Sequence, residues 1–307
     1  MPGRGHDGAI SRYRGAEAGT VRVGISGWLY GGWRGSFYPK ELRRRDELSY
    51  ASRHFDTIEI NGTHYSLQRP DSFARWYDET PDGFVFAVKG SRFITHMKQL
   101  RDIATPLANF FAQGVLRLED KLGPLLWQFS PRFRFNAEKL DAFLSLLPRD
   151  TDQAAALAAR HDHRLAGRSW TRTHRCRPLR HAVEIRHSSC LDRDFMALLR
   201  RHRVALVFAD TVDWPYAEDV TADFLYLRLH GSEVLYASGY EDEALEWWAA
   251  RIRSWSMGTQ PNDARLVDDT TPLPRQRRDV YVYFDNDAKV RAPFDAQVLR
   301  EKLRAAG

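Results

Sequence analysis

The stretch HAVEIRHSS, residues 181–189, begins as a buried β-strand and ends in charge. Val183 and Ile185 are apolar, whereas Glu184 and Arg186 are ionisable and alternate with them. Burying an unpaired charge costs several kcal/mol, so charged residues in such a strand need partners or a function. The stretch therefore predicts a buried strand whose carboxyl end forms one wall of a polar pocket.

Short runs of apolar, often β-branched residues recur along the whole chain. Most of them are almost continuously apolar, as strands that are buried on both faces are. Together with the opening stretch they predict eight strands, over residues 21–26, 55–60, 84–89, 123–129, 181–186, 204–210, 223–230 and 279–284.

Amphipathic helical patterns separate several of these strands. They cover residues 105–122, 137–147, 192–203, 241–255 and 294–306. Strands that alternate with helices in this way predict an α/β fold, namely a single (β/α)8 barrel of the TIM type over residues 21–307. An open doubly wound sheet is the alternative, but no GxGxxG loop follows the first strand.

Length and composition agree with one soluble domain. The chain has 307 residues, of which 43% are hydrophobic and 28% are charged. No run of about 18 apolar residues appears, so we expect no membrane partner. The two cysteines, Cys176 and Cys190, have neither CxxC nor zinc spacing, which favours a cytoplasmic location. Residues 1–20 lack the apolar core of a signal peptide and are expected to form a disordered tail.

Two segments are predicted to be polar inserts in the barrel. Residues 150–180 open with an Ala-rich helix and then become strongly basic, and residues 257–278 are expected to form a flexible polar loop. A four-residue spacing in the basic insert would place four arginines on one helix face. This stripe is either a solvated surface or a contact for an anion or a nucleic acid. Its members are Arg160, Arg164, Arg168 and Arg172.

Polar residues end nearly every predicted strand, and barrels of this type carry their chemistry at the carboxyl ends of the strands. Because side chains alternate along a strand, Glu59 and Asn61 share one face. A structural network needs one or two ion pairs, whereas six strands contribute charges here. The candidate catalytic residues are Glu59, Glu184, Asp210 and His230. The candidate substrate-binding residues are Trp28, Tyr30, Asn61, Tyr65, Lys89, Arg92, Gln128, Arg186, His187, Arg228, Asn286 and Asp287.

These residue types favour an enzyme that acts on a small anionic or phosphorylated molecule. Arg186, Arg228 and Lys89 would hold the anion. Glu59 or Glu184 would be the general acid or base, with His230 assisting proton transfer. The reaction class stays open between lyase, isomerase and hydrolase. No cofactor is predicted, and a divalent metal is the less favoured alternative, because the nearby cations raise its electrostatic cost.

Two other functions fit the same residues. A nucleic-acid binder, or a barrel that processes nucleic acid with a metal, would use the arginine stripe for phosphates and stack bases on Trp28, Tyr30, Trp33 and Tyr65. A non-catalytic ligand sensor would use the polar pocket without turnover. Binding that falls steeply with salt would favour the former, and turnover assays would separate the sensor from an enzyme.

Successive blocks of the chain resemble the YecE-like family, a bacterial and archaeal domain family of unknown function. The resemblance implies a TIM-barrel fold and implies no particular reaction. The family pattern EINxTFY has Phe where His64 stands, and RHxSF or RHxSW has an aromatic residue where Cys190 stands, which argues against catalytic roles for both. The basic insert and the N-terminal extension lie outside the family signature. The blocks are VRVGISGWLYGGWRGSFYP, TIEINGTHYSLQRP, FVFAVKGSRFITH, KLGPLLWQF, HAVEIRHSS, TADFLYLRLHG and VYVYFDNDAKVRAPFDA, which run from residue 21 to about 303.

Overall fold

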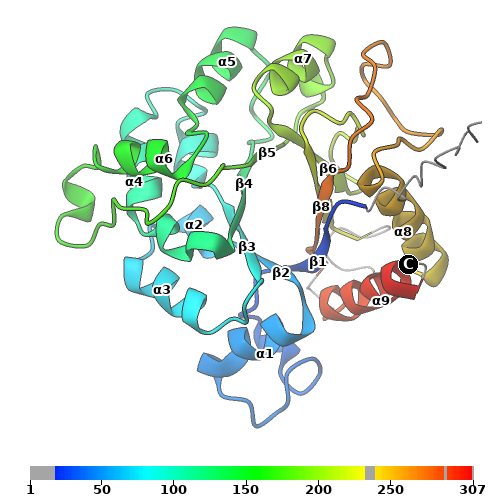
Figure 1. Cartoon of the computed structure of the whole chain (residues 1–307), viewed down its shortest axis with the longest axis horizontal. Coiled ribbons are helices and arrows are strands. Elements are labelled where there is room, and N and C mark those ends of the chain that lie inside the picture. The colour runs from blue at the N-terminus through cyan, green and yellow to red at the C-terminus, as the bar shows by residue number, and fades with distance from the viewer. Residues whose placement is uncertain (1–17, 232–238, 287–288, 306–307) are drawn as a thin grey trace, which may run out of the picture.

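Eight parallel strands close into a barrel in the order of the sequence (Figure 1). The computed structural model describes residues 18–231, 239–286 and 289–305. Closure is made by β1, which pairs with β2 on one side and with β8 on the other. All eight predicted strands and the predicted (β/α)8 barrel are confirmed. The strands are β1 Val21–Ser26, β2 Thr57–Ile60, β3 Val85–Lys89, β4 Leu122–Gln128, β5 His181–Glu184, β6 Ala205–Asp210, β7 Phe224–Leu229 and β8 Asp279–Phe284.

Helices cover the outside of the barrel. The five predicted helices are present, but the pattern over 105–122 is interrupted at Gly114, whose φ of 121° ends α4 before a 3-10 turn at 115–121. The amphipathic patterns did not predict three further helices, α1, α2 and α3. The helices are α1 Glu47–His54, α2 Gly62–Tyr65, α3 Pro70–Asp78, α4 Ala104–Ala112, α5 Ala137–Leu146, α6 Thr151–Ala158, α7 Arg193–Arg201, α8 Asp242–Ser256 and α9 Ala292–Ala305.

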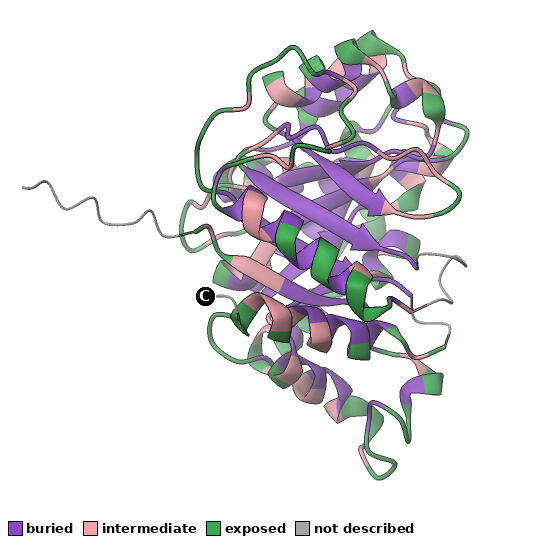
Figure 2. Ribbon diagram, turned by 90° about the vertical axis from the view of Figure 1, so that its right-hand side faces the viewer, coloured by how far each residue is buried: buried purple, intermediate pink, exposed green. Residues whose placement is uncertain are grey.

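Alternation along the strands sorts side chains into an interior and an outer core. Outward residues such as Ile58 and Val183 pack under the helices. Inward residues form a second cluster, in which small side chains such as Ala205 face the aromatic rings of Tyr226 and Tyr283. Figure 2 shows the strands as the buried centre and the helices exposed on their outer sides. The barrel interior is therefore filled below the strand ends, and the site has to lie above this filling.

The basic insert does not form the predicted arginine stripe. Its first helix, α6, is confirmed but ends at Ala158. Asp162 then accepts a hydrogen bond from the backbone N–H of Arg164 at 2.9 Å, which starts a 3-10 turn at 163–165. The prediction that the four arginines share one helix face is therefore wrong. A side chain that bonds to its own nearby backbone competes with continuation of a helix.

The segment 257–278 contains neither a helix nor a strand, as predicted for a loop. Its backbone is held by Asp219, which accepts from the N–H groups of Val267 at 2.8 Å and Asp268 at 3.0 Å. The flexibility expected for it stays a prediction. The predicted tail lies, for residues 1–17, outside the described residues. In the part of the chain that the structure describes, no helix is long and apolar enough to span a bilayer.

Candidate active site at the carboxyl end of the barrel

Arg228, on the interior face of β7, is the centre of a buried charge cluster. Its side chain is fully buried. Nη2 donates to Glu59 Oε1 at 2.9 Å and to Asp285 Oδ2 at 2.7 Å. Nη1 donates to Glu184 Oε2 at 2.8 Å, and Nε donates to Glu59 Oε2 at 3.1 Å. Three carboxylates from three strand ends thus share one guanidinium.

Glu59 is held by further donors on the same face. Tyr226 donates its hydroxyl to Glu59 Oε2 at 2.6 Å, and Ser26 donates its hydroxyl to Glu59 Oε1 at 2.5 Å. Ser26 Oγ in turn accepts from Asn61 Nδ2 at 3.0 Å. Both carboxylate oxygens of Glu59 are therefore occupied within the network. Neither Glu59 nor Arg228 therefore has bonding capacity left over for a further partner.

Glu184 forms a second buried ion pair with Arg186. Arg186 Nε donates to Glu184 Oε1 at 2.5 Å, and the central carbon of the Arg186 guanidinium lies over the ring of Trp214, 3.1 Å from its centre. Burial alone would raise the pKa of Glu184, but Arg186 and Arg228 outweigh it and lower that pKa to about 2. A carboxyl group this acidic holds no proton near neutral pH and is a weak base. The geometry thus gives little support to Glu184 as the general acid or base.

His230 belongs to the cluster, as expected from its strand position. Its Nδ1 lies 3.2 Å from Asp285 Oδ2, and its Nε2 lies 3.4 Å from Arg228 Nη1. Burial, together with the charge of Arg228, lowers the pKa of His230. A neutral ring that donates from Nδ1 and accepts at Nε2 fits both neighbours.

Lys89 ends β3 at the edge of this cluster. The residue is only 7% exposed, and within the described part of the chain its Nζ makes no hydrogen bond or ion pair. Burial, and then the charge of Arg228, lower the pKa of Lys89 to about 8, although Glu59 and Asp285 oppose this. An amine with this pKa exchanges a proton readily near neutral pH.

Two imidazoles lie beside Lys89. His64 Nδ1 donates to the carbonyl oxygen of Gly90 at 2.8 Å, and burial and then Lys89 lower the pKa of His64 to about 3. Its ring lies 5.3 Å from that of His96, whose pKa is lowered by burial, Lys89 and Arg186. Both rings are held neutral first by burial and then by the charge of Lys89.

Arg92 and Tyr65 lie together at the exposed rim. Tyr65 is 66% exposed, and the Arg92 guanidinium lies over its ring at 5.5 Å. Gln128 is half-buried and pairs in strand register with Glu184, which places it at the same end of the barrel. These three predicted substrate-binding residues therefore surround the charge cluster without entering it.

Other predicted residues are turned away from the cluster. Asp210 follows the inward-facing Ala209, so it points outward, where its Oδ2 accepts from Tyr240 at 2.8 Å. His187 caps a turn, its Nδ1 accepting from the backbone N–H of Ser189 at 3.1 Å. Both residues stand at strand ends, but the position at the end of a strand alone does not tell whether a side chain points inward or outward.

Three of the remaining predicted residues contact parts of the barrel other than the charged side chains of the cluster. Trp28 packs edge-on against Trp76, with 5.5 Å between ring centres, and Tyr30 donates its hydroxyl to the backbone carbonyl of Ser26 at 2.5 Å. Asn286 donates to Asp295 at 2.8 Å. Asp287 lies outside the described residues.

Three members of the site were absent from the predicted set. Ser26 and Asp285 lie at inward-facing positions. Ser26 pairs with Glu59 in strand register, and Asp285 follows the inward-facing Tyr283 by two residues, so side-chain alternation would have indicated both. Trp214 lies in the loop after β6, where no periodicity applies. Among the described residues, no group of three or more His, Cys, Asp or Glu is placed to hold a metal ion. The three converging carboxylates contact Arg228 instead.

Comparisons with known families give a consistent result over the whole barrel. The sequence model described as "Protein of unknown function DUF72" matches residues 22–307. The Escherichia coli K12 protein named UPF0759 protein YecE is 36% identical over 124 residues, and the Bacillus subtilis protein named UPF0759 protein YunF is 26% identical over 125 residues. These alignments cover 36% and 39% of this chain and 43% of each relative.

Solved structures share the fold. A DUF72 family protein from Thermotoga maritima has a TM-score of 0.67 at 25% identity, covering 93% of this chain and 99% of that one. A DUF72 family protein from Enterococcus faecalis has a TM-score of 0.65 at 16% identity, covering 93% of this chain and 96% of that one. The agreement extends over nearly the full length of both barrels.

Proposed function

We propose that this chain, which belongs to the DUF72 family of proteins of unknown function, is an enzyme that transfers a proton to or from a small anionic substrate at the carboxyl end of its barrel. The observation that carries the proposal is Lys89. The Lys89 residue is only 7% exposed, its Nζ makes no hydrogen bond or ion pair among the described residues, and burial lowers its pKa to about 8. Structural lysines are paired or exposed, whereas an unpaired lysine with a lowered pKa is typical of acid–base and nucleophilic sites.

The charge distribution supports an anionic substrate. Arg228 is saturated by carboxylates, so the predicted role of gripping the anion passes to Lys89, Arg186 and Arg92. Arg186 shares one carboxylate and stacks on Trp214, and Arg92 is exposed at the rim. A phosphate or carboxylate placed among these groups would meet cations and neutral imidazoles on the β3 side.

The cluster around Arg228 would keep these groups in place. Glu184 positions Arg186, and Asp285 orients the ring of His230. Since each of these acids is paired, the network holds its shape when the substrate enters. Positions fixed in this way lower the reorganisation needed in the transition state.

The experiment uses deuterium exchange to detect proton transfer without knowing the full reaction. A panel of phosphorylated and carboxylic metabolites is first screened for thermal stabilisation of the protein. Molecules that bind are then incubated in D2O and followed by NMR for exchange of their carbon-bound protons. We expect wild-type protein to catalyse exchange in at least one ligand, because Lys89 both loses and regains a proton near pH 8.

Two substitutions separate binding from catalysis. Lys89→Arg keeps the positive charge but cannot act as a base at this pH, so we expect it to retain binding and lose exchange. Lys89→Met should lose both. Exchange that persists in Lys89→Met would overturn the proposal. Binding without exchange or turnover in wild-type protein would identify a ligand sensor instead.

A further inference from the structure

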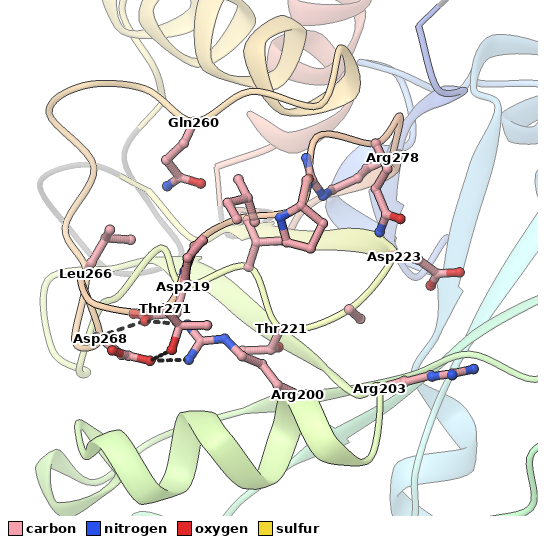
Figure 3. A pocket seen from close by; sticks show the side chains of 16 residues that line it. Arg200, Arg203, Asp219, Thr221, Asp223, Gln260, Leu266, Asp268, Thr271 and Arg278 are labelled. Atoms are coloured by element: carbon pink, nitrogen blue, oxygen red, sulfur yellow. Dashed lines mark hydrogen bonds and ion pairs between the residues drawn. The ribbon is translucent and has the colours of Figure 1, made fainter.

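A cavity lies at the amino-terminal end of the barrel, opposite the charge cluster of Arg228. Its volume is about 510 Å³, which falls in the range of small-molecule sites. It is formed where residues 219–223 lead into β7 and residues 271–278 lead into β8 (Figure 3). The cavity is thus built from chain segments that the proposed catalytic function does not use.

Arg278 supplies an unpaired cation to this cavity. The residue is 1% exposed, and Nε and Nη1 of its guanidinium have no hydrogen-bond partner among the described residues. Its Nη2 donates to the backbone carbonyl of Pro274. Figure 3 shows the Arg278 side chain extending into the cavity from the β8 side. An arginine does not escape burial by losing its proton, so this arrangement is costly unless an anion pairs with it.

None of the carboxylates of the cavity bonds to Arg278. Asp268 and Asp219 pair with Arg200, the latter at 3.2 Å. Asp223 is exposed at the edge, and Arg203 makes no ion pair within the described residues. The lining as a whole balances three arginines with three aspartates, but the Arg278 guanidinium has no carboxylate partner among the described residues.

The backbone fixes the position of Arg278. Its N–H donates to the carbonyl of Ser256 at 3.3 Å, and Gly19 donates to the same oxygen at 2.9 Å. A Cβ atom added to Gly19 would lie 2.1 Å from the carbonyl oxygen of Arg278, and one added to Gly258 would lie 2.6 Å from that of Gln276. The backbone around residues 276–278 therefore packs closely against the two glycines, which fixes the position of Arg278 in the cavity wall.

Apolar side chains supply part of the remaining wall. They are Val220, Ala222, Leu266, Pro272, Leu273 and Pro274, and they lie among polar residues such as Thr221 and Gln260. We propose that this cavity is a ligand site for a small organic anion, a carboxylate or a phosphate monoester with an apolar body, whose charged group pairs with Arg278. Apolar side chains combined with a few fixed charged groups are typical of small-molecule pockets.

The test is calorimetric titration with three probes of similar ring size. Benzoate and phenyl phosphate carry the anion, and benzamide is the neutral control. We expect at least one anion to bind wild-type protein and benzamide to bind more weakly. The preferred anion tells a carboxylate ligand from a phosphate ester. Arg278→Met should weaken anion binding about tenfold or more, because a charge-assisted hydrogen bond is removed.

Further variants keep the test decisive. Leu266 is 41% exposed, so Leu266→Glu should fold and repel the anion, whereas Leu146→Glu, at a 44% exposed leucine on α5, should bind as wild type does. Lys89→Met should also keep binding, because it alters the opposite end of the barrel. The proposal is overturned if neither anion binds, if binding survives both Arg278→Met and Leu266→Glu, or if Lys89→Met removes it.

The thermal stability of ligand-free protein gives an independent readout. If Arg278 is kept for a ligand, Arg278→Met removes an unpaired buried charge, and the melting temperature of the ligand-free variant should equal or exceed that of wild type. A purely structural Arg278 would instead lower the melting temperature when it is replaced. These outcomes do not depend on whether Lys89 is catalytic.

Discussion

At the scale of single residues, Arg228 compensates the buried negative charges of the site. One guanidinium faces Glu59, Glu184 and Asp285, and all four groups are almost fully withdrawn from water. Burying such charges is tolerated only while every partner is present. The contribution of Arg228 is therefore seen most clearly when it is removed.

We expect Arg228→Met to destabilise the protein by at least about 3–5 kcal/mol, because three carboxylates lose their common partner. Urea unfolding of the variant measures the change in the free energy of unfolding. The control is Arg300→Met, since the pair of Arg300 with Asp56 is partly exposed and should contribute about 1 kcal/mol or less. Equal losses in the two variants would contradict the buried network.

Lys89 predicts a pH dependence with a definite sign. Its pKa is lowered from 10.5 to about 8, so between these values the unfolded chain binds more protons than the folded one. Stability from this residue therefore rises with pH across the window from 8 to 10.5, by roughly 3 kcal/mol. Below pH 8 the charged Lys89 lowers the free energy of unfolding by its full amount.

The measurement is the difference in unfolding free energy between wild type and Lys89→Met at several pH values. We expect the variant to be the more stable protein near neutral pH and its advantage to shrink above pH 8. Arg92→Met is the control, because an arginine stays charged over this range. A difference that does not change with pH would show that Lys89 is not desolvated.

At the scale of elements, strand alternation decides which residues meet. The eight strands were predictable because parallel strands buried on both faces are apolar runs. Glu59, Glu184, Lys89 and His230 were found because they end such runs on the inward face. Asp210 was misplaced because a strand end has two faces, and only the register tells which one is inside. The arginine stripe failed because a local bond of Asp162 outweighed helical spacing.

His181 links three elements through a neutral ring. Trp127 on β4 donates Nε1–H to His181 Nδ1 at 3.1 Å, and His181 Nε2 bonds to the carbonyl of Pro148 at 2.7 Å. Nδ1 accepts here, so Nε2 must be the protonated nitrogen. Burial lowers the pKa of His181 from 6.5 to about 4.

We expect this residue to make the protein less stable as the pH falls from 6.5 towards 4, because the unfolded chain then binds the extra proton. The loss approaches roughly 3 kcal/mol. Urea unfolding of wild type and His181→Gln across this window measures it, since glutamine can accept and donate at the same places without titrating. The two proteins should converge in stability on acidification, and a stability difference that does not change with pH would contradict a neutral, buried His181.

At the scale of the whole molecule, the net charge of +6 and the basic insert keep a nucleic-acid partner as a prediction. The structure divides the insert's arginines among local contacts. Arg168 donates to the carbonyl of Arg164 at 2.9 Å, and Arg172 lies 5.0 Å from the ring centre of Trp170. These contacts hold two of the four arginines at separate places instead of on one helix face.

We expect replacement of the four arginines by serine to remove only about one or two phosphate contacts. The measurement is the salt dependence of binding to a short DNA duplex, followed by fluorescence anisotropy between about 50 and 200 mM salt, where each contact changes the slope by about 0.9. A change in slope equivalent to four phosphate contacts would support the nucleic-acid interface that the arginine spacing predicted. The replaced residues are Arg160, Arg164, Arg168 and Arg172.

The charge cluster has a consequence for the order in which the protein is made. Glu59 precedes its partner Arg228 by 169 residues, and Asp285 follows Arg228 by a further 57. On the ribosome, the first strands therefore emerge with an acid whose ion-pair partner Arg228 follows only after most of the chain has been synthesised. We expect a half-made barrel to stay open until β7 has emerged, because early closure would bury this acid without that partner. The last strand would then complete both the barrel and the charge cluster.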